Sequence, residues 1–242
     1  MPDPHQVAVP EHGEAHDGSI TGRLNALRAG VLGANDGIVS TAGLVIGVAA
    51  ATSNRAVVLT AGLAGLAAGA MSMAVGEYVS VSTQRDTEQA LIAKEIRELD
   101  EEPEAELAEL AGIYAAKGLT PSLALEVAEQ LTAHDALGAH AEAELGIDPT
   151  QHANPWHAAW ASMLAFTLGA LLPLLAIVLP PLQWRVPVTV VAVVLALAAT
   201  GWVSARLGDA DAGRATVRVV AGGLLAMAVT YGIGALVGTQ LG

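Results

Sequence analysis

Five stretches of the chain are apolar over a length that suits a spanning helix, which needs about 20 residues. The second and third stretches are separated by a polar region, residues 82–150, whose pattern predicts helices. We therefore predict an all-α, polytopic membrane protein with five transmembrane helices and a helical domain inserted between the second and the third. The predicted spans are residues 24–50, 56–81, 156–180, 186–207 and 215–239.

The same pattern divides the chain into four parts. Residues 1–21 are polar and are expected to form a disordered tail. Residues 22–81 hold the first two spans, which are expected to line a pore. Residues 82–150 form the acidic helical domain, and residues 151–242 hold spans three to five.

Proline and capping residues set the helix boundaries inside the acidic domain. Pro103 ends the extension of the second span, because the residue before a proline resists the helical conformation. One helix is predicted over 103–116. Another is predicted to start after the N-cap Thr120 and to continue towards Gly146, with a break near Asp135.

One unbroken helix is predicted to leave the second span and enter the acidic domain, because residues 67–102 contain no proline. Oxygen and sulfur side chains follow one another along it within an arc of about 80°, over roughly 40 Å. Oxygen ligands with one soft sulfur suit a divalent metal ion, so this row of side chains on one helical face indicates a metal path. Its members are Met73, Glu77, Ser80, Gln84, Glu88, Glu95, Glu98 and Glu102.

Three residues of the first two spans are candidates for a transport pathway. Asp36 lies in mid-span, where a carboxylate is costly unless it faces a cavity or a partner, and where it can exchange a proton for a metal ion. The alternative is a structural hydrogen bond to a neighbouring helix. Met73 is the first residue of this row of side chains, although a methionine in an apolar helix usually serves only to fill the core. Glu77 is predicted to be a ligand at the cytoplasmic mouth.

Composition agrees with a membrane protein. Of 242 residues, 53% are hydrophobic and 14% are charged, against about 25% charged residues in soluble domains. A net charge of −13 argues against nucleic-acid binding, and the absence of cysteine excludes thiolate metal sites. Acidic residues are concentrated, since 17 of the 24 lie within 77–148.

The basic residues predict the topology, because Lys and Arg accumulate on the cytoplasmic side. With a cytoplasmic N-terminus, only Arg55 and Arg185 of the 11 basic residues lie on the opposite side. We therefore expect a multi-pass protein of the cell membrane, plasma or inner, with its N-terminus and acidic domain in the cytoplasm and its C-terminus outside.

The acidic domain carries candidate metal ligands. His140 and Glu144 lie one helical turn apart, as two ligands of one ion would. Converging carboxylates without matching basic residues repel one another, and a bound cation relieves that repulsion. The alternative is a solvated acidic face that pairs with Lys94 and Arg97. The candidate ligands are Glu88, Glu95, Glu98, Glu102, Glu106, Glu109, His140 and Glu144.

Four motifs resemble the vacuolar iron transporter family, in its bacterial and nodulin-like members. They are GANDGIVSTAGLVIGV, AGAMSMAVGEYVSVSTQRDTE, AELGID and NPWHAA, and the resemblance covers residues 22–240. It implies a homodimer with five spans per protomer, a pore lined by the first two spans at the dimer axis, and a cytoplasmic metal-binding domain. It also implies proton-coupled export of ferrous iron, often manganese, from the cytosol.

In the matching motifs, Asp36 and Met73 stand where the family carries its Asp and Met of the first and second spans. This chain departs from some eukaryotic members at two places. Gly65 stands where they carry a Glu, and His140 with Ala141 stands where they carry paired methionines. Metal preference is therefore not carried over, and we hypothesise that Glu77 and His140 compensate. The matching cytoplasmic carboxylates are Glu95, Glu98, Glu106, Glu109 and Glu144.

These observations predict an antiporter that exports ferrous iron or manganese, and not an enzyme. The predicted ligand types do not exclude zinc or cobalt as the bound metal ion. No nucleotide-binding motif is present, and a ferroxidase would need paired Glu-x-x-His motifs that are not evident. The main alternative is a membrane-anchored metal buffer or sensor without transport. The expected partners are divalent metal ions, protons, the lipid bilayer and a second copy of the chain, with no prosthetic group.

Overall fold

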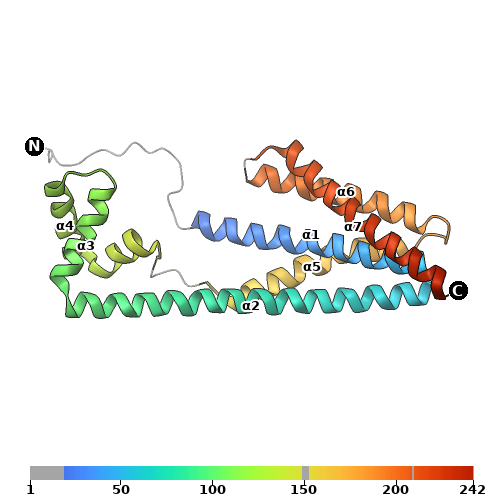
Figure 1. Cartoon of the computed structure of the whole chain (residues 1–242), viewed down its shortest axis with the longest axis horizontal. Coiled ribbons are helices and arrows are strands. Elements are labelled where there is room, and N and C mark those ends of the chain that lie inside the picture. Colours follow the sequence, from blue (N-terminus) through green and yellow to red (C-terminus); the bar gives the residue numbers. More distant parts are fainter. Residues whose placement is uncertain (1–18, 149–152, 209, 242) are drawn as a thin grey trace, which may run out of the picture. The chain divides into compact units, whose positions relative to one another are not determined.

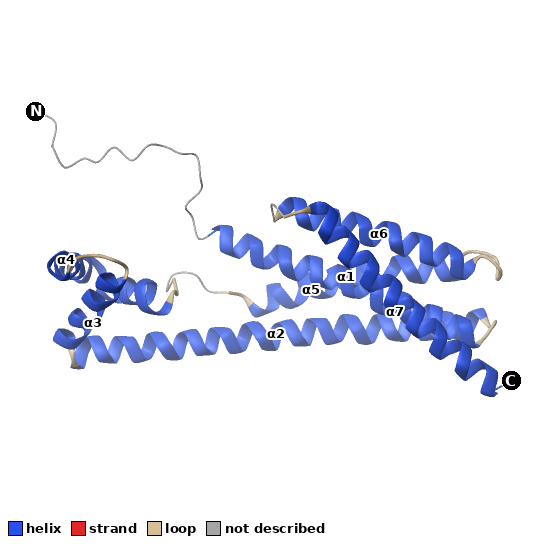
Figure 2. Ribbon diagram, turned by 45° about the horizontal axis from the view of Figure 1, so that its top comes forward, coloured by secondary structure: helices blue, strands red, loops and turns tan. Residues whose placement is uncertain are grey.

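The computed structural model describes residues 19–148, 153–208 and 210–241 (Figures 1 and 2), and every element in these ranges is a helix. The predicted all-α class is confirmed. The predicted tail lies outside the described residues as far as residue 18. In chain order the elements are α1 (Ser19–Ala51), α2 (Arg55–Glu101), α3 (Pro103–Ala116), α4 (Pro121–His140), the short π-helix η1 (Ala141–Leu145), α5 (Pro155–Val178), α6 (Arg185–Leu207) and α7 (Ala212–Leu241).

Five helices are long and apolar enough to cross a membrane, as predicted. A helix suits this environment because hydrocarbon offers no partner for backbone N–H and C=O groups. α2 has 47 residues, about 70 Å at 1.5 Å per residue, against a hydrocarbon core of roughly 30 Å. Its residues are mostly apolar up to Val81, with Arg55 and Glu77 as the charged ones, and frequently charged from Arg85 on. The first half of α2 is therefore the spanning part.

The helices form two compact units. The membrane unit takes the chain as far as Ala74 and again from Trp160, and the inserted unit comprises Val75–Ala159. α2 contributes its first part to one unit and the rest to the other. In the membrane unit α1 packs against α6 and α7 around an apolar core, whose fully buried members include Ala42, Val45, Ile46, Ile177, Val193 and Leu197.

Glycines let the helices of the membrane unit approach backbone to backbone. A Cβ on Gly37 of α1 would collide with the backbone of Phe166 in α5, and one on Gly234 of α7 would collide with the carbonyl oxygen of Gly47 in α1. Because lipid tails are as apolar as the side chains, helix association in a membrane depends on such close van der Waals packing. These glycines therefore hold α1 between α5 and α7.

Arg185, the first residue of α6, fixes the end of α1. Its guanidinium is buried and donates hydrogen bonds to the carbonyl oxygens of Ala49 at 2.6 Å, Thr52 at 2.5 Å and Ser53 at 3.4 Å. The last carbonyls of a helix lack intrahelical partners and carry partial negative charge, so the cation caps α1. Arg55 makes a comparable bond to the carbonyl oxygen of Pro180, at 2.8 Å.

The inserted unit is built on a hairpin of α3 and α4, which are in contact with each other and with η1. The helix over 103–116 and the N-cap Thr120 are found as predicted. α4 is interrupted at Asp135, where φ is −159° and ψ is 90°, which confirms the predicted break. The π-helical turn after His140 was not predicted. The buried apolar residues of this unit are Leu110 in α3, Ala124 and Ala128 in α4, and Ala141 in η1.

We predict that Gly234→Ala destabilises the protein by about 1–3 kcal/mol, because the new methyl group overpacks the contact with Gly47. Gly232→Ala, on the same helix, is the matched control. A Cβ there meets no atom within 4 Å, so only the intrinsic helical gain of about 0.5–1 kcal/mol remains. Thermal unfolding of both variants in detergent checks this, and equal unfolding temperatures would contradict it.

Candidate metal centres

Four potential ligands converge inside the inserted unit. One ligand atom from each of Glu95, Glu106, His140 and Glu144 can be chosen so that all four lie within 4.8 Å of one another. Glu95 comes from α2, Glu106 from α3, His140 from the last turn of α4 and Glu144 from η1. We call these four residues the acidic cluster. Three helices and a π-helical turn thus meet at one point with three carboxylates and an imidazole.

Local backbone features bring these side chains together. Pro103 ends α2 and starts α3 within two residues, so Glu95 and Glu106 lie on either side of a sharp turn. The Oδ1 atom of Asp135 accepts a hydrogen bond from the N–H of Gly138 at 3.0 Å, which caps the helical segment that leads to His140. The π-helical turn then widens the helix at Glu144, and π-helical turns are frequent at functional sites.

His140 lies at the centre of the acidic cluster. Its Nδ1 atom is 2.9 Å from Glu95 Oε1, 3.5 Å from Glu106 Oε2 and 3.9 Å from Glu144 Oε2. His140 is fully buried, and Glu95 is only 2% exposed. The short approach of Nδ1 to Oε1 lacks hydrogen-bond geometry. Glu95 Oε1 and both ring nitrogens therefore have no hydrogen-bond partner among the described residues. Buried polar atoms normally have a hydrogen-bond partner, so these three atoms are candidates to coordinate a cation.

The carboxylates of the acidic cluster are electrostatically strained. They lie beyond the spanning half of α2. Burial raises the pKa of Glu95, and the nearby Glu144 raises it further, although His140 opposes the shift. Burial likewise raises the pKa of Glu106, with Glu109 adding to it and His140 opposing it. A bound divalent cation would stabilise the charged form of both groups.

The other predicted ligands of the inserted unit do not join the acidic cluster in this structure. Glu98 accepts a hydrogen bond from Lys94 at 2.6 Å, which corresponds to the expected alternative of pairing with a basic neighbour. Glu88 accepts one from Gln84 at 2.8 Å. Glu102 and Glu109 are exposed. Their role as ligands stays a prediction.

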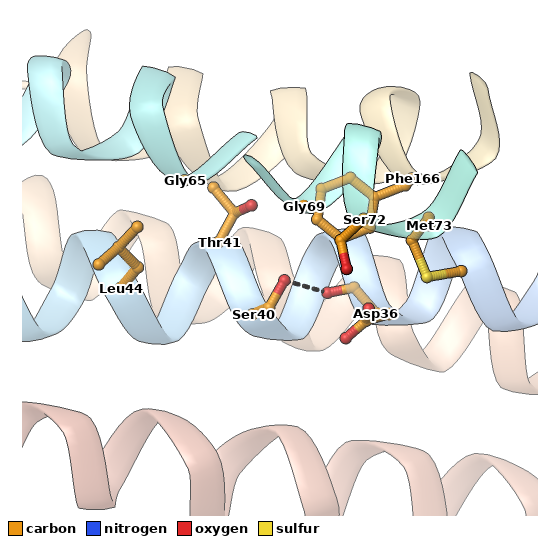
Figure 3. Close-up of a pocket in the computed structure, with 9 residues that line it drawn as sticks. All are labelled: Asp36, Ser40, Thr41, Leu44, Gly65, Gly69, Ser72, Met73 and Phe166. Atoms are coloured by element: carbon orange, nitrogen blue, oxygen red, sulfur yellow. Dashed lines mark hydrogen bonds between the residues drawn. The ribbon is translucent and has the colours of Figure 1, made fainter. Parts of the chain in front are cut away.

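A second candidate site lies in the membrane unit, in a cavity of about 200 Å³ between α1, α2 and α5. Figure 3 shows Asp36 and Ser40 from α1 facing Ser72 and Met73 from α2, with Phe166 of α5 behind them. The two predicted pathway residues Asp36 and Met73 thus line one cavity. Leu44, packed against Gly65, lines its other end.

Hydroxyl groups surround the acid of this cavity, and the sequence prediction missed them. Ser40 donates a hydrogen bond to the backbone carbonyl of Asp36 at 2.5 Å, drawn as a dashed line in Figure 3. Thr41 and Ser72 also line the cavity. Serine four residues after Asp36 shares its helical face, so the spacing contained this signal. The Asp36 carboxylate has no hydrogen-bond partner in the described part of the chain.

One further hydrogen bond lies beside Asp36, and one predicted pathway residue lies outside the cavity. The hydroxyl of Thr200 in α6 donates a hydrogen bond to Oδ1 of Asn35 at 2.7 Å, which restrains the rotation of α1 beside Asp36. Glu77 is half-buried on α2 and belongs to the inserted unit, so it does not line the cavity. Its role at the mouth of the path stays a prediction.

Comparison with known proteins gives consistent matches. A model described as the VIT family matches residues 27–235. The chain is 46% identical over 226 residues to a protein of Acanthamoeba castellanii named vacuolar iron transporter, covering 93% of this chain and 83% of that protein. It is 42% identical over 212 residues (87% and 73%) to vacuolar iron transporter homolog 1 of Oryza sativa subsp. japonica. It is 39% identical over 219 residues (90% and 86%) to vacuolar iron transporter homolog 3 of Arabidopsis thaliana.

The raised pKa values of Glu95 and Glu106 predict a pH dependence of stability in the metal-free protein. A carboxyl group with a raised pKa in the folded state contributes stability that is full below its ordinary pKa of 4.5 and is lost as pH rises through the raised value. The unfolding temperature with a chelator present is therefore expected to fall over that range.

The double variant Glu95→Gln with Glu106→Gln is expected to flatten this dependence, whereas the exposed Glu126→Gln on α4 should keep it. Thermal unfolding at a series of pH values measures both. Parallel curves for the wild type and the double variant would show that other groups are responsible.

Proposed function

Because the chain belongs to the VIT family, whose members are transporters and not enzymes, we propose that it exports divalent metal ions from the cytosol in exchange for protons. Ferrous iron is the first candidate cargo, since the relatives described above are named as vacuolar iron transporters or their homologs. Manganese is the second, because carboxylate and hydroxyl oxygens suit it equally. The five spanning helices agree with a multi-pass membrane protein.

The observation that carries this proposal is the cavity that holds Asp36 and Met73. A carboxylate in the middle of a spanning helix is costly unless it serves an ion path. Here it faces a thioether and three hydroxyl groups in a space of about 200 Å³, enough for an ion with some of its water. Carboxylate, hydroxyl and thioether ligands together suit a divalent ion of intermediate softness such as Fe²⁺.

Proton coupling follows from the chemistry of Asp36. Its carboxylate can hold either a metal ion or a proton, and each weakens the binding of the other. A proton that arrives from the outside neutralises Asp36 and releases the metal there. Loss of that proton to the cytosol restores the carboxylate for the next ion. Met73 binds metal but no proton at neutral pH, so it retains affinity for the cargo in both states.

The acidic cluster is proposed to collect metal on the cytoplasmic side. Its three carboxylates attract cations, and its unpartnered atoms are ready to bind them. Glu77 and the exposed or paired carboxylates Glu88, Glu98, Glu102 and Glu109 are proposed to raise the local cation concentration around it. Cytoplasmic placement rests on the distribution of basic residues, which also supports a cytoplasmic N-terminus, an outer C-terminus and location in the cell membrane.

A second copy of the chain is proposed to complete the membrane cavity. Asp36 and Ser40 are exposed in the single chain, and a carboxylate that faced lipid would be strongly unfavourable. A partner seated on α1 and α2 would remove this cost and enclose the ion path. This arrangement is a homodimer with the pathway next to its axis.

The rival function is a membrane-anchored buffer or sensor that binds metal without moving it. The acidic cluster favours it to some extent, because the four ligands lie within one compact unit. That function leaves the Asp36 cavity without a role, so flux measurements separate the two.

In proteoliposomes that contain a metal-quenched dye and an acidic lumen, we expect ferrous iron and manganese to enter faster than without the pH gradient. Asp36→Asn should reduce this entry at least about tenfold, because losing a charged ligand costs more than about 1.4 kcal/mol. Asp211→Asn, in the connection before α7, removes an exposed carboxylate away from the cavity and should transport normally.

Gradient-independent entry in the wild type would remove proton coupling from the proposal. If the wild type binds metal but none enters the vesicles, the buffer or sensor function takes its place.

A further inference from the structure

His140 differs in kind from the other three members of the acidic cluster. It offers a nitrogen of intermediate softness, whereas Glu95, Glu106 and Glu144 offer hard carboxylate oxygens. It is also fully buried, so its ring does not exchange freely between the cluster and solvent. The Nδ1 edge lies within 3.9 Å of an oxygen of each carboxylate.

The unpartnered atoms indicate a ligand independently of the acidic charge. Glu95 Oε1 and His140 Nδ1 are buried, face each other at 2.9 Å and have no hydrogen-bond partner among the described residues. Lys94 on α2 donates its hydrogen bond to Glu98 at 2.6 Å and interacts with Glu95 and Glu144 only through space. It therefore leaves the buried Glu95 Oε1 and His140 Nδ1 atoms without a hydrogen-bond partner.

The spacing of the ligand atoms fits a metal ion. Four tetrahedral ligands at about 2.0–2.2 Å from an ion lie about 3.3–3.6 Å apart, and the four ligand atoms here lie within 4.8 Å of one another. Glu144, whose side chain is 28% exposed, has the most room of the four to move towards that spacing, whereas His140 is fully buried.

We propose that His140 makes the acidic cluster selective, so that it binds ferrous iron, cobalt and zinc in preference to manganese, magnesium and calcium. The inference rests on the proposed function in one respect, namely that the cluster binds metal. Carboxylates alone suit magnesium, calcium and manganese, and one imidazole ligand adds affinity for iron, cobalt and zinc. His140 thereby enriches the cluster in ferrous iron relative to manganese without excluding manganese from the transport path.

The ring of His140 acts as a ligand through Nδ1, which requires its proton to lie on Nε2. Metal-bound histidines usually donate that second N–H to a partner that fixes the ring. Nε2 of His140 has no such partner in the described residues. Its orientation depends on packing instead, so the size of the side chain at this position is as important as its chemistry.

The experiment compares metal affinities in detergent for the full-length wild type and two variants that each lack one histidine. Cobalt, zinc and manganese are titrated separately into the wild type, His140→Gln and His134→Gln. His134 is an exposed histidine of the same helix α4 that lies outside the cluster. The comparison between the two variants cancels the contribution of the remaining histidines.

We expect His140→Gln to weaken cobalt and zinc binding by about tenfold or more while manganese binding changes less than about threefold. His134→Gln should behave as the wild type. An equal loss for all three metals, or no loss, would overturn the selectivity of His140 while leaving metal binding by the cluster intact. A wild-type protein that binds none of the three would overturn the cluster's part in the proposed function and the selectivity with it.

A second readout does not depend on a variant being well folded. In wild-type protein with ¹⁵N-labelled histidine, zinc should shift the Nδ1 signal of His140 to the position typical of a metal-bound nitrogen. An Nδ1 signal of His140 that does not move at saturating zinc would contradict direct coordination.

Discussion

The cost of taking charge and polar backbone out of water governs this molecule. In the spanning helices the backbone meets that cost because each N–H and C=O group is bonded within its own helix. Close contact between those helices then depends on glycine, as at Gly37 and Gly234, because lipid competes equally for apolar side chains. Asp36 places a carboxylate in this environment, where it lies exposed in the single chain and lines a cavity together with three hydroxyl side chains.

The inserted unit meets the same cost in a different way. Glu95 and Glu106 are removed from water by the packing of α3, α4 and η1, and among the described residues their only ion-pair partner is His140. Burial and mutual repulsion therefore leave two carboxylates with raised pKa values and three atoms without hydrogen-bond partners. Such a site is held together by the packing of its helices, and in the proposed function a bound cation offsets its electrostatic cost. This is the property expected of a group of ligands that must both bind and release an ion.

Much of this architecture could be predicted from the order of residues. The five spans, the helix over 103–116 and the break at Asp135 follow from apolar length, proline and capping, all of which act locally. The membership of the acidic cluster could not be predicted in the same way. Glu95 and Glu98 share a helical face, and only the packing of α3 and η1 decides that Glu95 is buried whereas Glu98 pairs with Lys94.

Arg185 has a consequence for how the chain enters the membrane. In the proposed topology it is one of two basic residues on the outer side, so its guanidinium must be translocated against the preference for keeping positive charge inside. The carbonyl oxygens that accept its N–H groups belong to the end of α1 and the residues just after it, which are made long before α6. The hydrogen-bond acceptors of Arg185 are therefore synthesised before Arg185 itself.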